Sequence, residues 1–181
     1  MSIARKVKIG NAVTQGNASG DDHNVHIKVS AKRIGGAKKQ KAGHALFANS
    51  PMSFIEVSDP AEIIMLIRKG LPSQAIDSVA GLLSLSRASF LEAIKIPVST
   101  IERRLRRGES LTAEESDRVS RVAKVLRRAV EVFDDVEQGK AWMTDTVSSL
   151  GGNTPVSLLD TMEGSELVLD TLSRIEFGVF G

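Results

Sequence analysis

From residue 59 to the end of the chain, apolar residues recur every three or four positions, which is the spacing of amphipathic α-helices. Asp59 and Pro60 form a typical helix start, an N-cap followed by proline in the first turn, and Gly70 ends the apolar run behind them. The same spacing predicts a second helix over residues 73–83. This part of the chain is therefore expected to be helical.

The longest predicted helix begins with a capping box formed by Thr112 and Glu115 and reaches Phe133. Its apolar stripe is continuous, so we expect it to be the central helix of the fold. A shorter helix is predicted to follow over residues 137–143.

The C-terminal part contains two further helix starts. Thr154 precedes Pro155, and Thr161 caps a last helix that Gly178 ends. Four apolar residues of the last helix are expected to face the core: Leu167, Val168, Leu172 and Ile175. The pattern as a whole predicts an all-α fold.

Residues 86–108 combine two short helices with a basic surface. One apolar face predicts a short helix before Pro97, and Ile101 with Leu105 predicts a second helix that starts near Val98. Two short helices joined by a tight turn are typical of a helix-turn-helix. The segment holds six basic and two acidic residues, so it suits a polyanion such as DNA.

The outward side chains of the second short helix are the expected DNA contacts. If Ile101 and Leu105 face inward, a rotation of about 100° per residue turns most of its arginines and hydroxyl groups outward. We expect base contacts from Arg103 and phosphate contacts from Ser86 and Arg87. The predicted DNA-binding residues are Ser86, Arg87, Ser99, Thr100, Arg103, Arg104, Arg106 and Arg107. The alternative is that these arginines only keep a surface helix hydrated.

Charge and composition divide the chain further. The first fifty residues contain six glycines and nine Lys or Arg against two Asp or Glu, with few large apolar residues. We expect a flexible basic arm over residues 1–55, in which the alternation at positions 25–29 is compatible with a short β-hairpin. The helix-turn-helix region is then expected over residues 56–110 and a C-terminal helical region over residues 111–181.

Six short motifs follow one another along residues 60–181: Gly70–Pro72, Ser99–Leu105, Leu111–Arg118, Leu150–Pro155, Leu158–Thr161 and Arg174–Gly178. Together they resemble the Xre class of helix-turn-helix repressors and the Xre/MbcA/ParS family of toxin-binding antitoxins. The resemblance implies an antitoxin that blocks a partner toxin, commonly a RES-domain enzyme that consumes NAD. Lys95 departs from the pattern, because such turns usually place glycine there to adopt a positive φ.

The resemblance assigns toxin binding to the C-terminal helices, with occlusion of the toxin's substrate pocket as the expected mechanism. Residues 134–181 hold nine acidic and two basic residues, which suit a basic NAD-binding cleft. The predicted toxin-binding residues are Asp160, Glu163, Glu166, Asp170, Arg174, Glu176, Phe177, Val179, Phe180 and Gly181. The alternative is that the last helix and its aromatic residues only complete the core.

Other chemistry has no signal in the sequence. The chain contains no cysteine, which excludes disulfides and thiolate metal sites. It carries no recognisable catalytic motif, so we expect no enzyme activity, no catalytic or metal-binding residue and no cofactor. It also lacks an apolar run of about eighteen residues, so we expect a cytoplasmic protein that does not enter the membrane and lies on the nucleoid when bound to DNA.

Helix-turn-helix proteins usually read palindromic operators as two-fold dimers, so we expect a homodimer bound near its own promoter. Two alternatives stay open at this point. The first alternative to an antitoxin is a transcription factor without a toxin, whose C-terminal helices serve dimerisation. The second is a toxin-binding protein that has lost DNA binding because of Lys95.

Overall fold

The computed structural model describes residues 46–47, 52–53, 55 and 59–179 of the chain, and the basic arm expected at residues 1–55, with its hairpin, lies almost entirely outside them. The described residues form seven α-helices, two 3-10 helices and no strand beyond two isolated bridges. The elements are α3 (Pro60–Lys69), α4 (Ala75–Leu82), α5 (Arg87–Ala93), α6 (Val98–Arg107), α7 (Ala113–Phe133), α8 (Val136–Thr144), η1 (Ser148–Leu150), η2 (Pro155–Leu158) and α9 (Met162–Phe177). The expected all-α fold is confirmed for this part of the chain.

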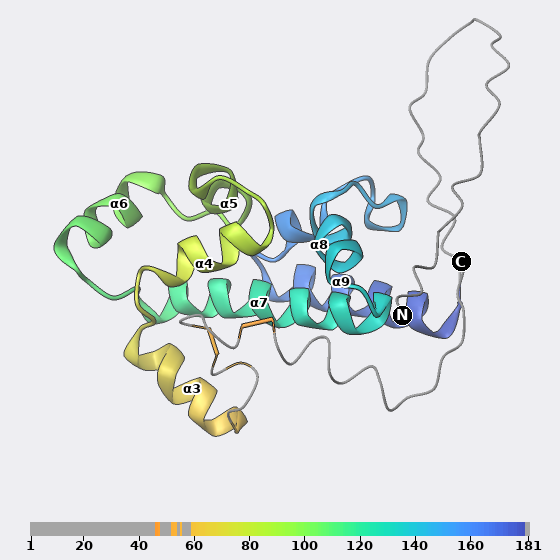
Figure 1. The fold of residues 1–181 in the computed structure, drawn as a ribbon, viewed down its shortest axis with the longest axis horizontal. Helices are drawn as coiled ribbons and strands as arrows, with labels where there is room; N and C mark the ends of the chain where they lie inside the picture. Colours follow the sequence, from red (N-terminus) through yellow and green to blue (C-terminus); the bar gives the residue numbers. More distant parts are fainter. Residues whose placement is uncertain (1–45, 48–51, 54, 56–58, 180–181) are drawn as a thin grey trace, which may run out of the picture. The chain divides into compact units, whose positions relative to one another are not determined.

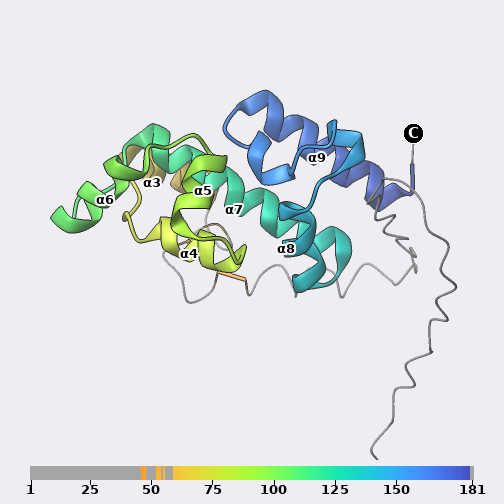
Figure 2. The same ribbon diagram turned by 90° about the horizontal axis from the view of Figure 1, so that it is seen from above.

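Helix α7 is the central element, as its sequence predicts. Its start is fixed by the capping box, in which the Thr112 amide donates to Glu115 Oε2 at 2.7 Å and the Glu115 amide donates to Thr112 Oγ1 at 3.2 Å. Figure 1 shows α4 and α5 along one side of α7 and α3 on the opposite side. Seen from above, α8 and α9 flank the later part of α7 (Figure 2).

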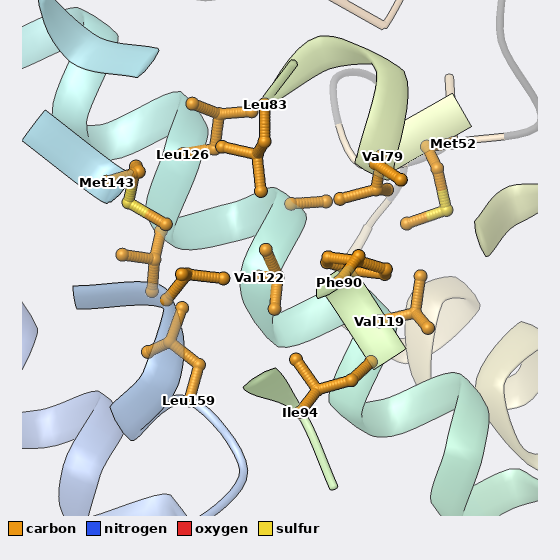
Figure 3. Packing of buried hydrophobic residues seen from close by; sticks show 14 of the residues in the cluster. Met52, Val79, Leu83, Phe90, Ile94, Val119, Val122, Leu126, Met143 and Leu159 are labelled. Atoms are coloured by element: carbon orange, nitrogen blue, oxygen red, sulfur yellow. The ribbon is translucent and has the colours of Figure 1, made fainter. Parts of the chain in front are cut away.

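The helices around α7 share one apolar core. Val122 of α7 is fully buried between Val79 and Phe90 on one side and Met143 and Leu159 on the other (Figure 3). The core therefore runs without interruption from the helix-turn-helix region to the C-terminal helices. No helix in the described part of the chain has the length and apolar character needed to cross a membrane.

A tight joint attaches α3 to the start of α7. Gly70 adopts a φ of 93°, and a Cβ atom there would lie 2.3 Å from the carbonyl oxygen of Leu111. The Leu111 amide donates to the carbonyl of Leu71 at 2.8 Å, and the Leu71 amide donates to the buried Ser116 hydroxyl at 2.9 Å. Only glycine permits both this torsion and this approach, so the position of α3 is well defined.

The C-terminal part confirms one expected helix start and corrects the orientation of one residue. Thr154 is the N-cap of the 3-10 helix η2, with Pro155 in its first turn, but it caps through its carbonyl, which accepts from the Ser157 hydroxyl at 2.7 Å, and not through its side chain. Leu167 does not face the core, because the buried stripe of α9 is centred on Val168 and Leu172 and leaves Leu167 47% exposed. Ile175 packs against the core as expected.

Candidate functional site

Helix α6 presents a cationic surface on a small apolar base. Ile101 is fully buried and Leu105 partly buried, while Ser99 and Arg103 are exposed. Arg106 and Arg107 are also exposed, and Thr100 and Arg104 lie at the edge with intermediate exposure. The structure thus confirms the expected orientation of these side chains, whereas their contact with DNA stays a prediction.

The turn before α6 keeps the left-handed geometry that Lys95 placed in question. Lys95 adopts a φ of 55°, a torsion that costs a residue with a side chain more than it costs glycine. Arg118 of α7 holds this turn, because its Nη1 donates to the carbonyl of Lys95 at 2.9 Å and to that of Ile94 at 3.3 Å. Glu114 pairs with the same guanidinium at 2.5 Å. The central helix therefore fixes the angle at which α6 leaves α5.

Of the four arginines on α6, Arg104 is held by other parts of the chain. Its Nε lies 3.1 Å from Glu115 Oε2, its Nη1 donates to the Ser110 carbonyl at 3.3 Å, and its side chain is only 17% exposed. Arg107 makes a longer contact of 3.6 Å with Glu109. Among the described residues, Arg103 and Arg106 have no acidic partner, so they are the freest cations of the surface.

Ser86 and Arg87 lie at the start of α5, where phosphate contacts are expected. Ser86 is the N-cap, and its hydroxyl accepts from the Ser89 amide at 3.1 Å. Arg87 donates through Nε and Nη2 to the two carboxylate oxygens of Asp77 at 2.6 and 2.9 Å. The hydrogen bonding of Arg87 to the Asp77 carboxylate raises the pKa of Arg87 above its ordinary value. The charge of Arg87 is therefore already paired within the protein.

Helix α9 exposes a mixed acidic and apolar surface. Glu163, Glu166 and Asp170 are exposed, and Asp160 just before the helix is half-buried. Asp170 pairs with Arg174 at 2.7 Å, whereas Glu176 pairs with Arg128 of α7 and is partly buried. Glu176 thus contributes to holding α9 on the central helix.

The end of α9 carries the most exposed large apolar side chain of the described residues, that of Phe177, and Val179 just behind the helix is exposed as well. Phe177 is 76% exposed and Val179 is 60% exposed. Phe180 and Gly181, also expected to bind the toxin, lie outside the described residues. Sequence reasoning missed the exposure of Met162, Leu167 and Leu169, which are 66%, 47% and 38% exposed and lie on the two edges of the acidic face of α9.

Sequence reasoning also missed the arginines of α7 that hold its neighbours. Arg121 donates to the Leu159 carbonyl at 3.1 Å, next to the start of α9, and Arg118 holds the turn before α6. Arg128 reaches Glu176 near the end of α9. These three arginines are spaced at i, i+3 and i+10, which places them within one side of a helix, and that spacing is the signal that would have found them. No group of three metal-binding side chains occurs among the described residues.

The described helices fall within matches to two domain families. Residues 62–124 match the antitoxin Xre-like helix-turn-helix domain, and residues 128–178 match the antitoxin Xre/MbcA/ParS C-terminal toxin-binding domain. The first match contains α4, α5 and α6, the second contains α8 and α9, and the two meet within α7.

Individual relatives agree with these matches. The chain is 37% identical over 116 residues to the protein named Antitoxin Xre from Yersinia enterocolitica, covering 63% of this chain and 78% of that protein. It is 30% identical over 115 residues to Antitoxin Xre from Photorhabdus laumondii, with 63% and 78% covered. A protein from a Sphingobium strain, named Prs ADP-ribosylating antitoxin, is 26% identical over 161 residues, covering 84% of this chain and 99% of that protein.

Proposed function

The chain belongs to the family of Xre antitoxins, and from this premise we propose that it neutralises a RES-type, NAD-consuming toxin and represses its own operon. Neutralisation is assigned to the exposed surface of α9 and the tail behind it. Repression is assigned to α6, in a homodimer bound to operator DNA. The protein itself performs no catalysis in this scheme.

The observation that carries the toxin-binding part is the exposed surface of α9. A helix that needs only to pack on α7 buries its apolar residues, yet Leu167 and Phe177 are 47% and 76% exposed. Such side chains beside Glu163 and Glu166 fit a partner cleft with a cationic rim and an apolar floor. A cleft that binds the phosphates and rings of NAD has this character, so α9 and the tail are suited to enter it.

Two kinds of toxin chemistry are compatible with the relatives. The family that the motifs of this chain resemble commonly binds a RES-type enzyme that degrades NAD. The Sphingobium relative carries the name Prs ADP-ribosylating antitoxin, which refers to ADP-ribosylation instead. ADP-ribosylation also uses NAD as its donor, so both toxins would present an NAD-binding cleft to α9. They differ in product, because only the second attaches ADP-ribose to a protein.

The test of neutralisation is co-expression of the neighbouring gene with this protein in a bacterial host. We expect growth arrest and loss of cellular NAD from the neighbouring gene alone, and recovery of both when the wild-type chain is present. The double variant Leu167→Glu/Phe177→Glu changes only exposed side chains and is expected to lose recovery while remaining folded by circular dichroism. Arg103→Ala is the matched control, and it should still neutralise.

The results separate the alternatives. Full recovery by the double variant would overturn the assignment of the toxin surface to α9. A neighbouring gene that causes no arrest would favour a repressor without a toxin. Arrest accompanied by ADP-ribosylated protein, instead of bulk NAD loss, would replace the RES assignment with an ADP-ribosylating toxin.

The DNA-binding proposal is supported by the free cations Arg103 and Arg106 on α6 and by the retained turn at Lys95. Its test is fluorescence anisotropy with the chain's own promoter fragment, at low salt, with and without toxin. We expect specific binding that competitor DNA of unrelated sequence does not remove. Absence of binding in both conditions would favour a toxin-binding protein that has lost its DNA-binding function.

A further inference from the structure

Helix α3 has apolar side chains on more of its circumference than it buries. Ile63 packs inward with a 9% exposed fraction, whereas Ile64 and Met65 are 48% and 69% exposed. Ala61 and Arg68 are exposed as well, so positions 61, 64, 65 and 68 form one outward stripe at i, i+3, i+4 and i+7. Helix α3 itself lies on the side of α7 opposite to α4 and α5 (Figure 1). The i, i+3, i+4, i+7 spacing of the outward stripe is the spacing with which one helix packs on another.

The charges beside the stripe select the direction of packing. Glu62 and Lys69 are both exposed and are seven residues apart, so they lie on the same flank of the stripe. In two parallel copies of α3 this flank would lie on opposite sides of the interface, so Glu62 and Lys69 would pair with neither residue of the other copy. Two antiparallel copies would bring Glu62 of each copy to Lys69 of the other and would align the helix dipoles favourably.

We propose that α3 is the dimerisation helix, which pairs antiparallel with α3 of a second copy through Ile64 and Met65. The two-fold axis passes between the copies near these two residues, and each Glu62 meets the Lys69 of the other copy. The tight joint at Gly70 and Leu111 holds α3 firmly on the start of α7, so the pairing also fixes how the two helix-turn-helix regions are arranged. This inference rests on the proposed function, in which the chain binds operator DNA as a homodimer.

A second copy fits this surface better than the toxin does. The match to the toxin-binding domain covers residues 128–178, and α3 lies entirely outside it. A helix of ten residues buries much less than the about 1,600 Å² of a standard protein interface, so the dimer should be weak, with a Kd in roughly the micromolar range. Binding to two adjacent half-sites then strengthens the pairing, since each copy raises the local concentration of the other.

The first test is sedimentation equilibrium of the full-length chain without DNA or toxin. We expect a reversible monomer–dimer equilibrium, weakened about tenfold by Glu62→Lys or by Lys69→Glu, because each change replaces two attractive contacts by two repulsive ones. The double variant Glu62→Lys/Lys69→Glu restores opposite charges across the pair and should recover dimerisation. Lys124→Glu, the same charge reversal at an exposed position on α7, is the control and should not alter the equilibrium.

The second test uses the absence of cysteine from the natural sequence. Met65→Cys should form a covalent dimer under mild oxidation, because the two-fold axis brings the two copies of this position together. Lys124→Cys, an exposed position on α7, should form none above the level of random collision.

Three results would overturn the proposal: a wild-type chain that stays monomeric on promoter DNA, charge variants that sediment alike without rescue, or a Met65→Cys chain that resists both cross-linking and alkylation. The last result would indicate that another part of the same chain covers α3. Dimerisation only in the presence of toxin would assign the stripe to the toxin complex. These assays measure neither growth arrest nor promoter repression. A negative result would therefore contradict pairing through α3 without contradicting the antitoxin function.

Discussion

Helices α6 and α9 are both amphipathic, but they expose opposite chemistry. On α6 one side chain, Ile101, is buried, and the outward surface consists largely of arginines. On α9 the buried stripe is longer, and the outward surface mixes carboxylates with Leu167 and Phe177. The inner stripes serve the same purpose, which is attachment to one core. The outer stripes therefore decide the partner, a polyanion for α6 and a protein surface for α9.

Salt should separate the two surfaces most strongly. If a dimer neutralises about six phosphates, raising salt from about 50 to about 200 mM lowers its DNA affinity about a thousandfold, because condensed counterions are no longer released as favourably. Toxin affinity should fall much less, since apolar burial at Phe177 and Leu167 does not depend on counterion release. Titrations of labelled promoter and of purified toxin at matched salt series measure both slopes. A steeper slope for the toxin would reverse the comparison.

Two adjacent arginines of α6 should respond differently to substitution. Arg103→Ala should weaken operator binding by about 1–3 kcal/mol, because the exposed guanidinium is free to contact a base. Arg104→Ala should instead lower the free energy of unfolding by about 1–3 kcal/mol, because it removes the largely buried ion pair with Glu115 and the hydrogen bond to the Ser110 carbonyl. Anisotropy and urea unfolding of both variants distinguish the effects. Equal stability loss in the two variants would show that α6 is not divided in this way.

The helix boundaries of this fold could be predicted because local signals set them. Asp59 accepts from the Ala61 amide at 3.1 Å, the capping box starts α7, and Gly178 ends α9 in a left-handed conformation. Thr154 and Pro155 also start a helix as predicted, although it is a short 3-10 helix and the threonine side chain makes no capping hydrogen bond. Such capping contacts depend on residues within one helical turn, which is why sequence alone suffices for them.

The partners of the charged residues could not be predicted in the same way. Rotation about the helix axis placed Arg103 outward correctly, but it could not reveal that Asp77 would reach Arg87 or that Glu115 would reach Arg104. The error at Leu167 has a similar cause, because a helix with apolar residues on several sides allows more than one rotation. Packing against α7, which is distant in the sequence, determines the rotation of α9 about its own axis. The local spacing of apolar residues does not predict that packing.

The turn at Lys95 allows a test of the scaffold beneath α6. Lys95→Gly should raise the free energy of unfolding by about 0.5–1 kcal/mol, because φ is 55° there and glycine adopts this torsion without strain. Lys124→Gly is the control, since the same change inside α7 should lower stability by a similar amount. Thermal unfolding of the two variants shows the sign directly. A destabilised Lys95→Gly chain would mean that the lysine side chain itself stabilises the turn.

The smallest effect is expected at Arg87, because Asp77 of α4 pairs with this arginine and so removes it from the free cations of the surface. Since both carboxylate oxygens of Asp77 already pair with one edge of its guanidinium, Arg87→Ala should reduce DNA affinity by less than about threefold. Asp77→Asn should act in the opposite direction, because it frees the cation for a phosphate and steepens the salt slope by about one. Salt titrations of the two variants against wild type provide the comparison. If Arg87→Ala instead weakens binding as strongly as Arg103→Ala, then Asp77 positions Arg87 against a phosphate, and the paired arginine belongs to the DNA-binding surface after all.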